Sequence, residues 1–183
     1  MNKKQKGFSL IELLIVVAII LIIAAIAIPN LLRSRMAANE ASAVGSIRTI
    51  TTAAITYNST YGQGFATKLV QLGGTAATAA TGLATCDSAL LLDSVLGGAD
   101  PSKKSGYSFS ILAGDGKSVL VGKCATPAST DGYGALAVPT TVGTTGQRSF
   151  CSDAGGVIRF DATGAAFTLA TAQCSAGSGI LGQ

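Results

Sequence analysis

The fold of this chain is decided by the stretch GFSLIE at residues 7–12. It is followed by an apolar run from Leu13 to Ile28 and then by Pro29. Between Phe8 and Ile28 the only charged side chain is that of Glu12. As a helix, these residues would span about 31 Å, close to the thickness of the hydrocarbon core of a bilayer. We therefore expect a membrane to be the first solvent of this segment, and its lone carboxylate is a candidate functional group.

With the basic leader before it, this stretch resembles the class III signal of type IV pilins and of the pseudopilins of type II secretion. The resemblance is strong from residue 1 to about residue 57 and loose beyond. It implies that a membrane prepilin peptidase cuts after Gly7 and that Phe8 becomes the N-methylated N-terminus. It also implies that Glu12 guides assembly.

The electrostatics of the segment give this acid a physical reason. Cleavage would create a positive amine at Phe8, and Glu12 of one subunit could pair with the amine of a neighbour. Each charge is costly in an apolar core, so the two would offset one another. The resemblance thus implies a homo-oligomeric helical filament, built by an inner-membrane assembly machinery.

Two other interpretations of the N-terminus stay open. A general secretory signal peptide has the same basic start and apolar centre, and Ala25-Ile26-Ala27 fits its small-x-small cleavage site. A plain membrane anchor fits the apolar run as well. A mature chain beginning at Phe8 would support the pilin type, whereas a start at Ile28 would exclude it.

The net charge of the chain has a topological meaning. The chain has 183 residues and a formal charge of +4, of which Lys3, Lys4 and Lys6 in the leader supply three. Without the leader the side-chain charge is small, which speaks against a specific nucleic-acid site. The positive-inside rule predicts a cytoplasmic start and an external remainder. The resemblance implies that the chain lies first in the inner membrane and then in an extracellular filament.

The four cysteines are Cys86, Cys124, Cys151 and Cys174. All lie on the predicted external side, where an even number of cysteines indicates disulfides. Three pairings are possible; we favour Cys151–Cys174 and Cys86–Cys124, and free buried thiols remain an alternative. No CxxC pair is present, which argues against a zinc site.

A helix is predicted to continue from Asn30 to Tyr61, beyond a kink at Pro29. Two separate helices are the alternative. One face of this helix should be apolar and covered by a domain: Met36, Ala43, Ile47, Ile50, Ala54, Tyr57 and Tyr61. The polar residues expected off this face are Arg33, Arg35, Glu40, Ser46 and Arg48. Gly62 is the predicted helix stop.

The remainder of the chain changes to the pattern of a small antiparallel sheet. We expect a loop at residues 73–82, a short helix from Ser88 to Leu96, and an alternating strand at residues 107–111. Asp115-Gly116 predicts a hairpin, with a return strand at residues 119–124. Further strands are expected at residues 134–138, 148–152, 157–161 and 166–170.

The predicted fold class is α+β, with a long N-terminal helix packed on this antiparallel sheet. One sheet face would cover the helix while the other stays wet. The resemblance implies the ladle-like fold of pilins. The predicted segments are a leader at 1–7, a transmembrane and filament-core helix at 8–29, an amphipathic continuation at 30–61 and a globular head at 62–183.

The sequence offers little for catalysis. It contains no histidine, which excludes Ser-His-Asp and Cys-His arrangements, and we expect neither an enzyme nor a cofactor. Asp131, Asp153 and Asp161 are weak calcium candidates, suggested by calcium sites in the loops of major pseudopilins. Asp131 and Asp161, like Asp115, sit at or near a glycine and could instead serve a turn.

The function expected from the resemblance is that of a structural subunit, the major pilin of a type IV pilus. Such a filament serves adhesion, twitching motility or DNA uptake. The alternative is a pseudopilin of a type II protein secretion system, and a minor, tip-located pilin is a third possibility.

Overall fold

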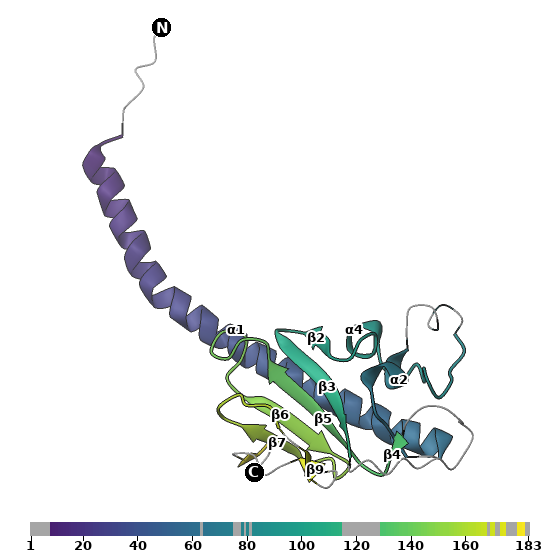
Figure 1. The fold of residues 1–183 in the computed structure, drawn as a ribbon. Coiled ribbons are helices and arrows are strands. Elements are labelled where there is room, and N and C mark those ends of the chain that lie inside the picture. The colour runs from purple at the N-terminus through teal and green to yellow at the C-terminus, as the bar shows by residue number, and fades with distance from the viewer. Residues whose placement is uncertain are drawn as a thin grey trace. The chain divides into compact units, whose positions relative to one another are not determined.

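The computed structural model describes residues 8–62, 64–74, 78, 80, 82–114, 129–167, 169–170, 173–174 and 179–181. It divides into two units, residues 1–35 and 36–183. The predicted α+β class is confirmed, since a long helix and an antiparallel sheet are the main elements (Figure 1).

Helix α1 (Leu10–Tyr61) is 52 residues long and continues unbroken through Pro29, so the alternative of two separate helices is wrong. The helix ends where the sequence predicted. The N–H of Gly62 donates to the carbonyl of Asn58 over 2.8 Å, and Gly62 has a φ of 68°. This left-handed conformation is easily reached by glycine and closes the last turn.

The first unit contains the N-terminal part of α1, and its apolar side chains are exposed. Every large apolar residue from Leu10 to Ile22 has at least 43% of its surface exposed. No described residue of this unit covers the helix, as expected for a segment surrounded by lipid or by other apolar helices.

In the second unit, the remaining turns of α1 pack on the sheet through the predicted face. Ala43, Ile47, Ile50, Ala54 and Tyr57 are fully or almost fully buried, while Met36 and Tyr61 at the ends are half-buried. They form one core with the inward-facing side chains of the sheet.

Two polar residues of this helix contradict the prediction. Glu40 and Ser46 were expected off the packed face, yet both are buried. Glu40 lies four residues after Met36 and three before Ala43, so helical spacing places it on the packed face. The prediction failed because a polar side chain was assumed to lie off the packed face.

The described residues form a six-stranded antiparallel sheet of order β10-β7-β6-β5-β3-β2. Its strands are β2 (Ser102–Lys104), β3 (Tyr107–Ala113), β5 (Tyr133–Pro139), β6 (Ser149–Asp153), β7 (Ile158–Asp161) and β10 (Gly179–Ile180). Four of them confirm predicted strands. The predicted hairpin at residues 115–116 and its return strand at 119–124 lie outside the described residues.

The expectation of one wet sheet face is wrong in part. Leu136 and Cys151 point away from α1 and pack with Phe167 and Cys174, which lie between β7 and β10 in the sequence. Successive side chains of β5 and β6 therefore point alternately into two hydrophobic cores, one on each face of the sheet. Every residue of β6 is buried. The C-terminal segment covers this second face through the disulfide described below.

The smaller elements of the second unit are β1 (Phe65–Ala66) paired with β4 (Ser129–Thr130), β8 (Leu169–Ala170) paired with β9 (Gln173–Cys174), and the short helices α2 (Leu69–Gly73) and α4 (Ser94–Gly97). Helix α2 was not predicted. Of the strand expected at residues 166–170, the last two residues form β8, residues 166 and 167 are not in a strand, and residue 168 lies outside the described residues.

The short helix predicted from Ser88 to Leu96 is also wrong at its start. Helix α4 begins at Ser94, and Asp93 is its cap, with a carboxylate that accepts from the N–H of Leu96 over 2.8 Å. The Ser88 hydroxyl donates to Thr78 instead of capping a helix, and Leu90 has a φ of 53°, which interrupts helical geometry.

Candidate assembly site

The N-terminus of α1 places Glu12 at the start of the first helical turn. Ser9 precedes the helix, and its backbone N–H donates to the Glu12 carboxylate over 2.9 Å. This is one half of a capping box, in which an acidic residue satisfies an N–H that the helix leaves unpaired. The carboxylate also lies at the positive end of the helix dipole.

The other predicted residues of this site adjoin it along the chain. Phe8 is 80% exposed and directly precedes Ser9, whereas Gly7 and the rest of the leader lie outside the described residues. In a mature chain beginning at Phe8, the new amine would be one residue from the N–H that Glu12 now accepts. Glu12 thus has an acceptor role within a single chain.

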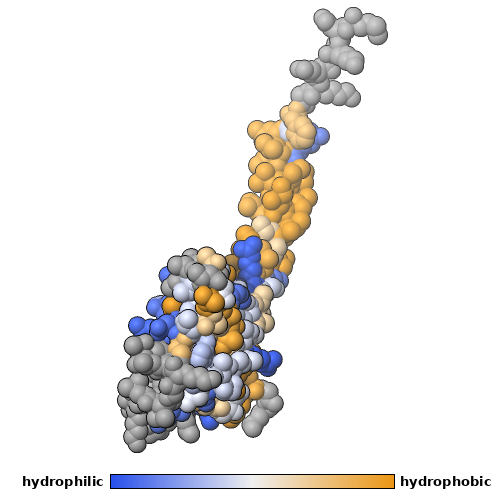
Figure 2. Space-filling view, turned by 90° about the vertical axis from the view of Figure 1, so that its right-hand side faces the viewer, coloured by the Kyte–Doolittle hydropathy of each residue, from blue (hydrophilic) through white to orange (hydrophobic). Residues whose placement is uncertain are grey.

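The surface behind this terminus has the character of a membrane span. The most apolar stretch of α1 has a mean hydropathy of 3.3, and none of it is buried. Figure 2 shows the corresponding surface as an almost continuous orange helix. A helix near the N-terminus with this length and composition is able to cross a bilayer.

In the second unit, Glu40 and Arg148 form a partly buried ion pair that the sequence analysis did not predict. The guanidinium of Arg148 donates twice to one carboxylate oxygen of Glu40, over 2.9 and 2.7 Å. The other oxygen accepts from the backbone N–H groups of Gln147 and Arg148, over 2.9 and 3.2 Å. One side chain thereby ties α1 to the start of β6.

Electrostatics around this pair favour an ionised Glu40. Burial alone would raise the pKa of the Glu40 carboxyl, but the N–H of Gln147, the Arg148 guanidinium and the N–H of Arg148 outweigh it and lower the pKa. Burial raises the pKa of Tyr107 well above its ordinary value, and the Glu40 charge adds to the effect. The Tyr107 hydroxyl donates to the Arg148 carbonyl over 2.8 Å.

Arg148 also lies over aromatic rings, 5.6 Å from the ring centre of Phe150 and 5.4 Å from that of Phe160. Such cation–π contacts hold the guanidinium in one orientation. An open pocket of about 340 Å³ beside the pair is lined in part by Arg48 and Leu181. The ion pair and these ring contacts together join α1 to the sheet.

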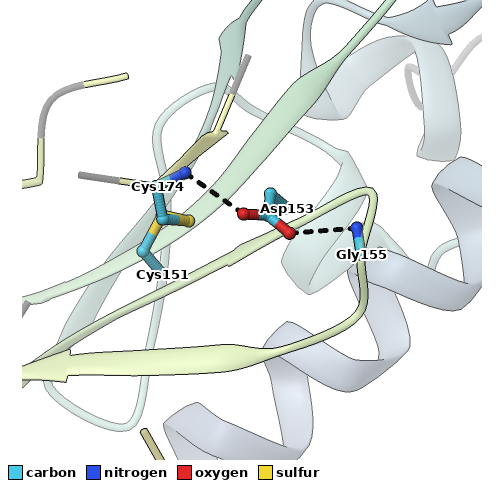
Figure 3. Close-up of a disulfide and its surroundings, with 4 residues drawn as sticks. All are labelled: Cys151, Asp153, Gly155 and Cys174. Atoms are coloured by element: carbon cyan, nitrogen blue, oxygen red, sulfur yellow. Dashed lines mark hydrogen bonds between the residues drawn. A yellow bond between two sulfur atoms is a disulfide. The ribbon is translucent and has the colours of Figure 1, made fainter. Parts of the chain in front are cut away.

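The disulfide between Cys151 and Cys174 is confirmed, with a Cα–Cα distance of 6.0 Å. Figure 3 shows it beside Asp153, whose carboxylate accepts from the N–H groups of Gly155 and Cys174 over 2.9 and 3.3 Å. Cys86 is also disulfide-bonded, but Cys124 lies outside the described residues, so the second pairing stays a prediction.

The three calcium candidates do not come together as a metal site. Asp153 serves the β6–β7 turn, Asp161 accepts from the N–H of Thr163, and Asp131 is exposed. Within the described part of the chain, no group of three or more Asp, Glu, Cys or His side chains is placed to hold a metal ion.

Comparison with known proteins places the similarity at the N-terminus. A family model described as the prokaryotic N-terminal methylation motif matches residues 2–28. The type IV wide pilus major component PilA4 of Thermus thermophilus is 63% identical over 38 residues, 21% of this chain and 29% of that protein. The type IV major pilin protein PilA of Myxococcus xanthus is 46% identical over 52 residues, 28% of this chain and 24% of that protein.

These matches are strong but local. The chain spans less than a third of the length of either relative, and no solved structure matches it. Beyond the matched segment, the α+β fold agrees with the fold that the resemblance implied. The N-terminal motif and the two relatives confirm that this chain is similar to type IV pilins, which points to a structural protein.

Proposed function

We propose that this chain is the major structural subunit of a type IV pilus, assembled from the inner membrane into a helical filament. The observation that supports this most is the N-terminal half of α1, whose apolar side chains nothing in its own unit covers. A bilayer would cover them in the precursor, and neighbouring copies of the same helix would cover them in a filament. Helix bundling can replace lipid at little hydrophobic cost, because both surroundings are apolar.

Maturation begins with the leader. A prepilin peptidase removes residues 1–7 by cutting between Gly7 and Phe8, and the new amine of Phe8 is methylated. The matched methylation motif supports this step, since it covers these residues. The lysines of the leader hold the start in the cytoplasm, and the head at residues 62–183 lies outside.

Assembly then uses an exchange of partners at Glu12. Among the described residues of the single chain, its carboxylate accepts from the backbone N–H of Ser9 at its own helix start, a bond with one charged partner. In the filament, the Phe8 amine of a neighbouring copy takes that place and supplies a full positive charge. The bond then joins two opposite charges, whose attraction is strong in an apolar core, and the exchange sets the register of the two helices.

Two substitutions separate capping from charge pairing. Glu12→Gln keeps an oxygen that accepts the Ser9 N–H but loses the charge, whereas Glu12→Ala loses both. We expect both variants to be inserted and cleaved before Phe8, and neither to form filaments. Electron microscopy of sheared surface material and mass spectrometry of the mature N-terminus check this. Filaments of normal number from Glu12→Gln would exclude charge pairing, and a mature N-terminus other than Phe8 would exclude the processing step.

Both relatives are major pilus components, which favours a pilus over a secretion filament for this chain. Mass spectrometry of sheared surface filaments separates the two functions. An abundant chain there supports the pilin. Its absence, together with loss of protein secretion on deletion, would instead indicate a pseudopilin.

A further inference from the structure

Two arginines follow the apolar part of α1, and neither forms an ion pair with a residue that the structure describes. Arg33 and Arg35 are both exposed, and within the described residues the only ion pair joins Glu40 to Arg148. The nearest acid further along the helix is therefore already engaged. Arg33 and Arg35 carry two charges beside an exposed apolar surface that includes Leu31 and Leu32.

The length of the helix places these arginines at a particular depth. Counted from Phe8 at about 1.5 Å per residue, Arg33 lies ~38 Å along the helix. An average tilt of about 20° reduces this to ~35 Å. The hydrocarbon core is about 30 Å thick and the whole bilayer about 40–45 Å. If Phe8 lies at the inner boundary of the hydrocarbon, both guanidinium groups reach the outer headgroup layer.

The positions of the two arginines around the helix favour a partner that surrounds the helix on all sides. Residues two apart are separated by about 200° on an α-helix, so Arg33 and Arg35 point to opposite sides. An acid on one neighbouring protein could meet only one of them. A layer of headgroups surrounds the helix and meets both.

The charge distribution along the chain calls for such a partner. Basic residues within a short distance of the external end of a span oppose the orientation that the leader lysines favour. An arginine bound to phosphate escapes this conflict, because its planar fork donates two parallel hydrogen bonds to oxyanions.

We propose that Arg33 and Arg35 bind phospholipid phosphate groups in the outer leaflet and hold the inserted subunit at that depth before assembly. The inference rests on the membrane-inserted stage of the proposed function. It adds a lipid site to that stage, with a preference for anionic phospholipid because the two arginines carry a charge of +2.

The test compares lipid retention by the full chain and two variants. Each is inserted into vesicles of equimolar phosphatidylglycerol and phosphatidylcholine, and insertion is verified by resistance to alkaline extraction. The chain is then extracted in mild detergent, and mass spectrometry gives the ratio of the two retained lipids. The variant is Arg33→Gln with Arg35→Gln. The matched control is Arg48→Gln, an exposed arginine of the same helix far from the span.

We expect the unchanged chain and Arg48→Gln to retain phosphatidylglycerol in excess. A basic residue beside an anionic surface strengthens association about fivefold, so the double variant should lower the excess up to about 25-fold. The proposal would be overturned if the double variant retained the same excess of phosphatidylglycerol as the unchanged chain, or if Arg48→Gln lost as much of the excess as the double variant. So would a double variant that retains lipid normally yet forms no filaments, because the arginines would then contact a neighbouring subunit.

The same experiment distinguishes failure of the proposed function from failure of the lipid site. If alkali removes the unchanged chain from the vesicles, the membrane stage is wrong and the lipid site falls with it. If the chain is inserted but retains no excess of phosphatidylglycerol, the lipid site alone is refuted.

Discussion

At the residue scale, Glu40 illustrates how a charged side chain is tolerated against the core. Its two carboxylate oxygens accept four hydrogen bonds, two from backbone N–H groups and two from the Arg148 guanidinium. All of them come from residues more than a hundred positions away along the chain. A buried acid of this kind stabilises one docking geometry between α1 and the sheet.

Replacing Glu40 by alanine should therefore destabilise the second unit by about 2 kcal/mol. This is less than the 3–5 kcal/mol of a fully buried pair, because Arg148 is 38% exposed. Urea unfolding of the full chain in detergent measures it. Arg48→Gln is the control, since Arg48 makes no ion pair among the described residues, and it should change stability by less than about 0.5 kcal/mol. If Glu40→Ala lowered the free energy of unfolding as little as Arg48→Gln does, the ion pair would not stabilise the second unit.

The same residue predicts a pH dependence. The pKa of Glu40 is lower in the folded than in the unfolded state, so the unfolded chain binds its proton first as the pH falls. Its stabilising contribution is complete above the ordinary glutamate pKa and is lost as the pH falls through the lowered folded value. Glu40→Ala should show a weaker acid dependence in this range, and parallel acid curves for both chains would contradict this.

Gly45 is a second residue whose surroundings allow a prediction. It lies in the interior of α1, and a Cβ added there would meet no atom within 4 Å. Glycine lowers helix stability relative to alanine, so Gly45→Ala should stabilise the chain by about 0.5–1 kcal/mol. Gly73→Ala is the contrasting variant, because its Cβ would collide with the backbone of Gly97. Urea midpoints that shift in opposite directions would bear this out; equal shifts would not.

At the scale of elements, α1 has two parts with opposite requirements. Its N-terminal turns expose apolar side chains around the whole helix, whereas its later turns bury one face against β3, β5 and β6. The sheet in turn is covered on its second face by the disulfide-linked C-terminal segment. The sheet therefore supports two cores.

Two isoleucines of α1 test which face carries the packing. Ile50 is fully buried and Ile55 is 49% exposed. Ile50→Ala should cost about 2–5 kcal/mol, through lost apolar burial and the cavity left behind. Ile55→Ala should cost about 0.5 kcal/mol or less. Urea unfolding of the two variants under identical conditions gives the comparison, and similar costs would show that the helix docks by another face.

At the scale of the whole molecule, the two units differ in what they need from their surroundings. Both hydrophobic cores of the described residues lie in the second unit, whereas the apolar surface of residues 8–35 has no cover from the described residues of its own unit.

A fragment of residues 36–183 should therefore fold and remain monomeric in water, while the full chain requires detergent, lipid or copies of itself. Analytical ultracentrifugation gives the oligomeric state, and near-UV circular dichroism reports the packing of the buried tyrosines Tyr57, Tyr107 and Tyr133. A fragment that aggregates or lacks a near-UV signal would show that the second unit depends on the first.

The sequence by itself determined the features that depend on neighbours along the chain. The apolar run with its single acid predicts the membrane-type helix, Gly62 its end, and the alternation at Tyr107, Phe109 and Ile111 a strand. Local spacing suffices for these, because helix and strand periodicities are set by the backbone.

Only the tertiary structure decided the features that join distant residues. The burial of Glu40 depends on Arg148, the covered second sheet face on Cys174, and the role of Asp153 on the N–H groups that reach it. The late start of α4 depends on Ser88 bonding to Thr78. A polar side chain has several possible uses, and the partner that the fold brings within hydrogen-bonding distance selects one of them.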